Sequence, residues 1–452
     1  MTRRGNSAAA AFARIGAISA IIIALIALGG LWLPQRQRHF SLEALPRLAA
    51  RQLPNDDEET AAAMRFLSQR LSRDPEDFVA QNMLASYFLK RVRETNNVDY
   101  LRLATHAANA SLASVPRERN PGALSALGHA EFAGHDFVKA RDHAIALTNL
   151  EPGQGSGYAL LGDALLELGD YDGASRAFQE MQRLGFAAAG AETRLARLVL
   201  LRGDPEAARG HLIRALAFAL NLPVPPRETA AWCYWQLGEI AFSVGEYETA
   251  ERRYRDALIA FPGYFNALPS LGRVRAARGD LAGAIQEYER AVTVLPDPAA
   301  VAALGDLYML ADRRDDAKAR YALVEQIGRL AAINGAASNR GLALFYTDHD
   351  LHTDLAFGDA LREYTTRRDI YGADALAWAA LKAGKLDESR EAMRAALRLG
   401  TQDAKLFYHA GMIARAAGDK ASARDYLRRA LKLNPRFDPW QSEIAEKAMA
   451  RL

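Results

Sequence analysis

The chain has 452 residues, of which 50% are hydrophobic and 25% are charged, as in an ordinary folded protein. Its 57 basic and 54 acidic residues give a formal net charge of +3 and alternate along the chain, which excludes a strongly basic nucleic-acid-binding surface. One cysteine, Cys233, excludes an internal disulfide and a cysteine-based metal site. We expect Cys233 to be a small buried hydrophobic residue within a helix.

The N-terminus combines a short basic tail with a long apolar stretch. Residues 1–14 contain three arginines, and residues 15–34 form 20 residues without a charge. At about 1.5 Å per residue such a helix matches a hydrocarbon core of roughly 30 Å. A basic start followed by an apolar centre is also typical of a secretory signal. The sequence therefore predicts a transmembrane helix or a signal at 15–34, followed by a juxtamembrane linker at 35–55.

We expect a single-pass anchor with the rest of the chain outside the cytoplasm. Short tails before a first apolar segment usually stay inside, although arginines on both sides of the stretch make the positive-inside count close to a tie. Two alternatives stay open. The protein is secreted or periplasmic after signal cleavage, or the chain faces the cytosol.

Beyond the linker, the chain repeats with a fixed period. One unit places small and aromatic residues at Leu237, Gly238, Gly245, Tyr247, Ala250, Tyr254, Ala257 and Pro262. The same offsets return 34 residues later at Leu271, Gly272, Gly279, Leu281, Ala284, Tyr288, Ala291 and Pro296. A fixed period of this length predicts an array of stacked helical units rather than a set of separate globular domains.

The repeats divide the rest of the chain into blocks. We expect a first block at 56–220, a Pro-rich insertion at 221–230, a second block at 231–327, an interruption with a degenerate repeat at 328–367, C-terminal repeats at 368–436 and a capping helix at 437–452. In the capping helix, Trp440 and Ile444 are expected to face the array.

The offsets resemble the tetratricopeptide repeat, whose unit of 34 residues follows the pattern W-x₂-L-G-x₂-Y…A-x₃-F…P. The resemblance covers roughly residues 56–452. It implies an all-α fold, an α-solenoid of about nine to ten helix–turn–helix repeats forming a right-handed superhelix, preceded by one N-terminal hydrophobic helix. In this family the first helix of each pair lines the concave face.

The physics of the pattern explains its small residues. Glycine inside a helix costs about 1 kcal/mol relative to alanine, so Gly238 and its equivalents predict a close approach of two helices. Facing alanines such as Ala250 are expected to be small for the same reason. A Gly-Asp pair such as Gly169-Asp170 is expected to end one helix in a left-handed conformation and begin the next.

The resemblance also indicates which residues line the concave face. One residue past each signature glycine the chain carries a row of polar groups, and three aromatic residues lie near its middle. The candidate partner-binding residues are Trp232, Trp235, Glu239, Phe242, Arg273, Asp306, Arg197, Asp163 and His129. Aromatic residues beside Arg and Glu have the composition of an interface anchor. The alternatives are that the charged row is a solvated face and that Trp232 and Trp235 are buried packing.

The sequence carries no nucleotide-binding, zinc-protease or serine-hydrolase motif, so no catalytic residue and no cofactor are predicted and the protein is not expected to be an enzyme. One stretch alternates His and Asp at 348–354. It falls at the turn of the degenerate repeat, where Asp350 and Asp354 are natural helix caps. A metal-dependent activity or a regulatory role at 347–354 is kept as an alternative.

The expected function is a non-catalytic protein–protein interaction scaffold that is tethered to, or exported across, a membrane. Its partners are expected to be a protein or peptide, with the membrane bound through the N-terminal helix and no nucleic acid. A second alternative is an assembly factor of a cell-envelope secretion or polysaccharide-export complex.

Overall fold

The computed structural model of the protein describes residues 53–333 and 340–452. The basic tail, the apolar stretch at 15–34 and nearly all of the linker at 35–55 lie outside the described residues. Among the helices that are described, none has both the length and the apolar character needed to cross a bilayer.

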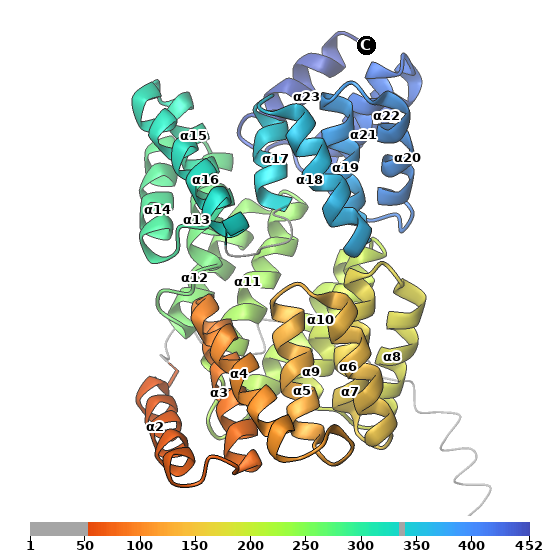
Figure 1. Ribbon diagram of the computed structural model, residues 1–452. Helices are drawn as coiled ribbons and strands as arrows, with labels where there is room; N and C mark the ends of the chain where they lie inside the picture. The colour runs from red at the N-terminus through yellow and green to blue at the C-terminus, as the bar shows by residue number, and fades with distance from the viewer. Residues whose placement is uncertain (1–52, 334–339) are drawn as a thin grey trace, which may run out of the picture. The chain divides into compact units, whose positions relative to one another are not determined.

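The described residues form α-helices, with one short 3₁₀ helix and no strand (Figure 1). The helices are α2 (Asp57–Arg73), α3 (Phe78–Thr95), α4 (Val98–Ser114), η2 (Arg117–Arg119), α5 (Pro121–Ala133), α6 (Phe137–Leu150), α7 (Gly155–Glu167), α8 (Tyr171–Arg183), α9 (Ala188–Leu201), α10 (Pro205–Leu220), α11 (Arg227–Ser243), α12 (Tyr247–Ala260), α13 (Ala267–Ala277), α14 (Leu281–Val294), α15 (Pro298–Leu310), α16 (Arg314–Ile333), α17 (Arg340–Asp348), α18 (Thr353–Thr366), α19 (Ile370–Lys382), α20 (Leu386–Ala396), α21 (Ala404–Ala416), α22 (Lys420–Leu433) and α23 (Gln441–Ala450).

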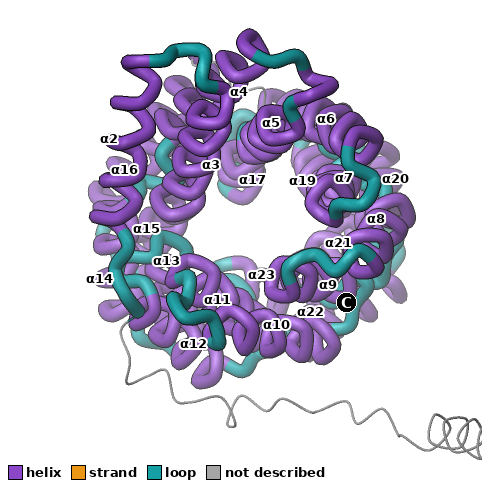
Figure 2. Tube along the Cα trace, turned by 90° about the horizontal axis from the view of Figure 1, so that it is seen from below, coloured by secondary structure: helices purple, strands orange, loops and turns teal. Residues whose placement is uncertain are grey.

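From α3 to α22 these helices form antiparallel pairs, each joined by a tight turn, and successive pairs stack in chain order. Figure 2 shows the first helices α5, α7 and α9 on the inner side of the array and α6 and α8 on its outer side. We call the surface formed by the first helices the inner face. The expected all-α repeat array is confirmed.

The turns within the pairs follow the predicted chemistry. Gly169 ends α7 with φ at +78°, a left-handed conformation that glycine adopts without steric cost. Asp170 follows it, and its Oδ1 accepts a hydrogen bond from the Gly173 amide at 2.8 Å. The carboxylate thereby satisfies one of the unpaired N–H groups in the first turn of α8.

The glycines in the middle of the first helices lie against large side chains of the packed helices. A Cβ at Gly238 would lie 2.4 Å from Cε1 of Tyr254, the aromatic residue four positions after the signature alanine. Gly162 has the same relationship with Phe178, at 2.2 Å. The close approach of two helices that was predicted at these glycines is therefore present. Gly162, Gly238, Gly272 and Gly305 each make room for an aromatic ring of the second helix in their own unit, whereas Gly128 and Gly411 face leucine side chains.

The closing helix α23 also differs from the expectation. Its buried positions include Ser442, Ala445 and Ala448, whereas Ile444 is 37% exposed. The helix therefore packs through small residues. Trp440 precedes it, and its ring meets the ring of His349 edge-on at a centroid distance of 6.0 Å.

Turns of the third to fifth helix pairs, α7/α8 to α11/α12, contact segments that lie about 200 residues later in the sequence. The Ile370 amide donates to Tyr171 Oη at 2.8 Å, and Asn434 Nδ2 donates to the Phe242 carbonyl at 2.7 Å. Between these two contacts, the Thr401 hydroxyl donates to the Leu201 carbonyl. We call this set of contacts the seam. In Figure 1 the contacts of Tyr171 and Leu201 lie where the yellow α8–α10 meet the blue α18–α20, and the Asn434 contact joins the green α11 to the segment after α22.

The seam brings backbones together closely. A Cβ on Gly169 would lie 2.3 Å from the Arg368 carbonyl oxygen, so this turn has room only for glycine. Beside it, both Arg197 and Arg367 pair with the carboxylate of Glu167. Although burial favours the neutral acid, the two guanidinium groups lower the pKa of Glu167 to about 2.

Candidate partner-binding site on the inner face

A cavity of about 480 Å³ opens on the inner face around Trp232. We call it the Trp232 pocket, and its volume is in the range of ligand-binding cavities. Its walls come from α3, α5, α7, α9, α10 and α11 and from the insertion before α11. Three of the residues predicted from the sequence, Asp163, Arg197 and Trp232, line it together.

The Pro-rich insertion supplies one wall of this pocket. Leu222 and Pro226 lie between α10 and α11, and both line the cavity beside Trp232. Proline lacks the N–H needed inside a helix, and Pro226 stands immediately before α11. The side chain of Leu222 is 50% exposed, and Phe132 adds a second aromatic ring from α5. The pocket therefore offers apolar surface that the fold itself leaves uncovered.

The charged residues on the α7–α9 side of the pocket are paired with each other. Arg194 donates from Nε and Nη2 to Asp163 Oδ2 at 2.9 and 2.7 Å, and from Nη1 to the Gly190 carbonyl at 2.9 Å. Nearby, His129 places Nδ1 2.8 Å from the Ser125 carbonyl. Burial lowers the pKa of His129, which favours the neutral imidazole.

The α3–α11 side of the pocket holds a looser pair. Arg93 Nε lies 4.0 Å from Glu228 Oε2, beyond hydrogen-bond distance, and the Arg93 side chain is 57% exposed. The Glu228 side chain is only 18% exposed, and burial raises its pKa. Among the described residues, this contact is the one ion pair of Arg93.

A second cluster on the inner face lies one unit further, between α11 and α13. Arg273 Nη2 donates to both oxygens of Glu239 at 2.6 and 2.7 Å. The Tyr254 hydroxyl also donates to Glu239, at 2.8 Å. Although burial opposes the charge, the Glu239 carboxylate raises the pKa of the Arg273 guanidinium. Within the predicted row of alternating charges, Glu239 and Arg273 of neighbouring units therefore pair with each other.

The aromatic residues of this second cluster are part of its packing. Trp235 is half-buried and donates from Nε1 to Ser270 Oγ at 3.0 Å. Phe242 is 5% exposed, and the Arg273 guanidinium lies 4.2 Å from its ring centroid. The Phe242 ring therefore packs within the core and leaves little surface for a partner.

Asp306, the last predicted residue of the row, belongs to a third group. The Tyr321 hydroxyl donates to its Oδ1 at 2.8 Å, and His349 Nε2 lies 2.7 Å from the same oxygen. The nine predicted residues therefore fall into separate sets rather than one site. Three of them share the Trp232 pocket, with His129 nearby. Trp235, Glu239, Phe242 and Arg273 form the second cluster.

Comparisons with known families agree with this architecture. One family model, described as tetratricopeptide repeat, matches residues 187–260, and a second with the same description matches residues 236–301 and 375–436. These matches cover the helix pairs from α9 to α14 and most of the two pairs from α19 to α22. The chain carries tetratricopeptide repeats. Such repeats generally mediate the binding of protein partners.

The comparison with curated proteins finds no match. Among solved structures, yeast Tom70 has 12% identity and a TM-score of 0.38 over 88% of this chain and 97% of that chain. A human IFIT1 dimer with PPP-AAAA has 14% identity and a TM-score of 0.43, covering 84% of this chain and 96% of that chain. Pseudomonas aeruginosa pilF has 15% identity and a TM-score of 0.29, covering 67% of this chain and 99% of that chain.

The His- and Asp-rich stretch at 348–354 is held by side chains from later helices of the same chain. Asp348 accepts from Trp378 Nε1 at 2.8 Å and from Lys405 Nζ at 3.1 Å, and Asp350 pairs with Lys382 at 2.6 Å. The residue before α18 is His352, so neither Asp350 nor Asp354 occupies the expected cap position. Within residues 53–333 and 340–452, no group of His, Cys, Asp and Glu is placed to hold a metal ion.

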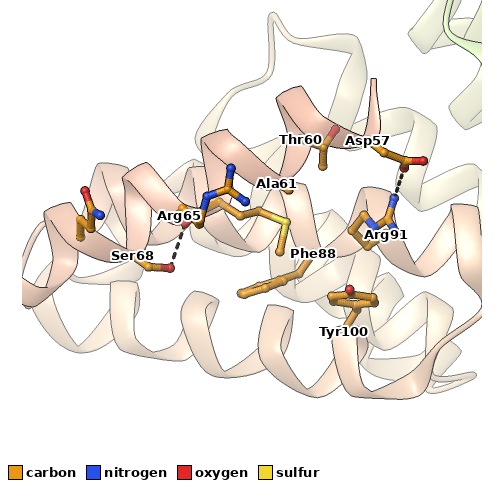
Figure 3. Close-up of a pocket in the computed structure, with 10 residues that line it drawn as sticks. Asp57, Thr60, Ala61, Arg65, Ser68, Phe88, Arg91 and Tyr100 are labelled. Carbon is orange, nitrogen blue, oxygen red and sulfur yellow. Dashed lines mark hydrogen bonds and ion pairs between the residues drawn. The ribbon is translucent and has the colours of Figure 1, made fainter. Parts of the chain in front are cut away.

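Another cavity, of about 540 Å³, lies at the start of the array between α2, α3 and α4 (Figure 3). The ring of Phe88 stacks on Tyr100 at a centroid distance of 6.2 Å, and Arg91 donates to Asp57 at 2.6 Å. Glu94 also engages Arg91, at 2.7 Å. The charges of Asp57 and Arg91 within this cavity are thus already paired.

Sequence reasoning missed Arg93, Phe132, Leu222 and Glu228 in the Trp232 pocket. Arg93 lies in extra residues of the first repeat and Leu222 lies in the insertion, so departures from the period were the available signal. Cys233, adjacent to the pocket, is fully buried as predicted, and burial raises the pKa of its thiol.

Proposed function

We propose that this protein is a non-catalytic scaffold that binds a protein partner in the Trp232 pocket of its tetratricopeptide array. The observation that carries the proposal is the coincidence of an open, partly apolar cavity with the inner face of the repeats, where first helices of several units converge. Extended concave surfaces are the binding surfaces of stacked helical repeats in general.

The chemistry of the pocket supports binding rather than catalysis. Its carboxylates and guanidinium groups are mostly arranged as ion pairs between neighbouring units, such as Asp163 with Arg194. The buried thiol of Cys233 has a raised pKa and is therefore a poor nucleophile. A half-buried tryptophan surrounded by charged residues matches the usual composition of an interface hot spot.

We further propose that residues 15–34 tether this scaffold to a membrane, with the repeats outside the cytoplasm. The support is the uncharged run of 20 residues after a basic tail. A reporter fused to the C-terminus that is active in the cytosol alone would refute this orientation. Recovery of the full chain in the soluble fraction with an intact N-terminus would refute the tether.

The scaffold proposal is tested by crosslinking and affinity purification of the full chain and of the Trp232→Ala variant. The matched control is Phe66→Ala, which removes another aromatic ring that is 62% exposed on α2. We expect the parent and the control to recover the same partner and Trp232→Ala to lose it. Circular dichroism of each variant separates loss of binding from loss of folding. Equal recovery by all three proteins would contradict the proposal.

A further inference from the structure

We infer that the Trp232 pocket takes a partner segment in which a large apolar side chain is flanked by acidic side chains. The inference rests on the proposed function and names the chemistry of the ligand. Its carrying observation is an imbalance in the pocket between hydrogen-bond donors that are still open and acceptors that are already in use.

The apolar half of the ligand follows from the lining of the cavity. Trp232 is half-buried, Leu222 is 50% exposed, and Phe132 and Pro226 complete an apolar wall. Exposed apolar surface gains roughly 25 cal/mol for each Å² that a ligand covers. A leucine or aromatic side chain is the group that gains most from such a wall.

Two arginines of the pocket have more N–H donors than the hydrogen bonds they make within the described residues. A guanidinium group carries five N–H donors. Arg93 has one carboxylate at 4.0 Å and no hydrogen bond among the described residues. Arg197 has one carboxylate partner there, Glu167, and its side chain is 41% exposed. Both side chains therefore present open donors at the pocket.

The acceptors of the same region are largely in use. Asp163 Oδ2 receives two N–H groups of Arg194, and Glu167 is held by Arg197 and Arg367 from opposite oxygens. Glu228 is mostly buried, which leaves little of its carboxyl group to a ligand. An incoming carboxylate thus finds the open donors of Arg93 and Arg197, whereas an incoming ammonium group meets Asp163 and Glu167 only beside the guanidinium groups that already hold them.

The placement of the two arginines favours acidic side chains over a chain terminus. Arg93 belongs to α3 and Arg197 to α9, so the open donors come from different helices around the cavity. A single terminal carboxylate supplies one group, whereas acidic residues on either side of an apolar one supply two. Charge-assisted hydrogen bonds are stronger than those between neutral groups, so these two donors favour a ligand with acidic side chains.

The test is selection of random dodecapeptides, displayed with amidated or free C-termini, against the full chain in detergent micelles. We expect peptides whose binding needs Trp232 to be enriched in Asp or Glu beside Leu, Phe or Tyr, with either type of C-terminus. Their affinity is expected to fall by about tenfold or more in Arg93→Gln and in Arg197→Gln, since 1.4 kcal/mol corresponds to a factor of ten. The control Arg102→Gln removes a side chain that is 83% exposed on α4 and is expected to change nothing.

The outcomes separate the two proposals. If no peptide binds in a Trp232-dependent manner, the proposed function of the pocket fails. If such peptides are found but are not enriched in acidic residues, or bind both arginine variants as well as the parent, the inference alone is overturned. Binding that requires a free C-terminus would also overturn it, because the carboxylate would then come from a chain end.

Discussion

The hydroxyl of Tyr171 accepts a hydrogen bond from the backbone amide of Ile370 at 2.8 Å, although 199 residues separate them. In most repeat proteins each unit contacts only its neighbours, so stability is close to a sum of local terms. The seam adds contacts between units far apart in the sequence. Because of these contacts, we expect distant units of the array to unfold together rather than independently.

The first prediction concerns the Tyr171 contact itself. Tyr171→Phe removes the acceptor of a buried amide, and leaving such a donor unpaired costs about 1–3 kcal/mol. We expect the amide of Ile370 to exchange with deuterium faster in the variant, as measured by hydrogen exchange. Tyr158→Phe is the control, since this half-buried hydroxyl has no hydrogen bond among the described residues. Unchanged protection at Ile370 would show that the seam is not formed in solution.

The second prediction concerns cooperativity. Because the seam joins the units of α8–α11 to those of α19–α22, we expect α9–α12 and α19–α22 to lose protection together as urea is raised. Combining Thr401→Val with Asn434→Leu removes two seam donors, whose partners are the Leu201 and Phe242 carbonyls. We expect the two helix groups to separate into distinct transitions in this variant. Separate transitions already in the parent protein would contradict the prediction.

The third prediction tests the glycines of the first helices. In Gly238→Ala the new Cβ would meet the Tyr254 ring at 2.4 Å, so the ring or the helix must shift. Overpacking of this kind costs about 1–3 kcal/mol in the free energy of unfolding. Gly210→Ala is the matched control within α10, because its nearest atom is the end of Arg214 at 3.6 Å. We expect the free energy of unfolding of Gly210→Ala to rise by up to about 1 kcal/mol, because alanine has the higher helix propensity. Equal stabilities in urea titrations would refute the packing argument.

The fourth prediction concerns pH. His349 places Nε2 2.7 Å from Asp306 and Nδ1 2.7 Å from the Phe345 carbonyl, and both partners only accept hydrogen bonds. The imidazolium form satisfies both contacts. Although burial opposes the charge, the Asp306 hydrogen bond raises the pKa of His349, and Asp348 adds to this effect.

Because its pKa is raised in the folded state, His349 contributes stability that is fully present when the pH is below the pKa of histidine in the unfolded chain, about 6.5. This contribution is lost as the pH rises through the pKa that His349 has in the folded protein. We expect the difference in unfolding free energy between the parent and His349→Gln to shrink over that interval. His106→Gln, on the exposed side of α4, supplies the baseline. A difference that stays constant between acidic and alkaline pH would exclude a role for the charged imidazole.

Much of the fold could be read from the period of the sequence. Gly169 and Asp170 act as the turn and cap that their residue types predict, because these effects are local to the backbone. The partner of Gly238 could not be read in the same way. Choosing between Ala250 and Tyr254 as its neighbour needs the distance between two packed helices, which sequence spacing does not give.

The candidate site was predictable only in part. Asp163, Arg197 and Trp232 were predicted because first helices line the inner face in this family. Arg93 and Leu222 were not predicted, because they lie where the period of the repeats is interrupted. The ion pair of Glu239 with Arg273 was also unforeseen, since residues one period apart become neighbours only when units stack.

The sequence by itself determined the repeating unit of this protein, its turns and its balance of charge, because each depends on residues a few positions apart. The tertiary structure alone decided which charges are paired, which aromatic rings are buried and where a cavity stays open. It also decided the seam, in which residues such as Thr401 and Leu201 meet across 200 positions of the chain. The curvature that brings them together is accumulated from small rotations between units, and no single unit encodes it.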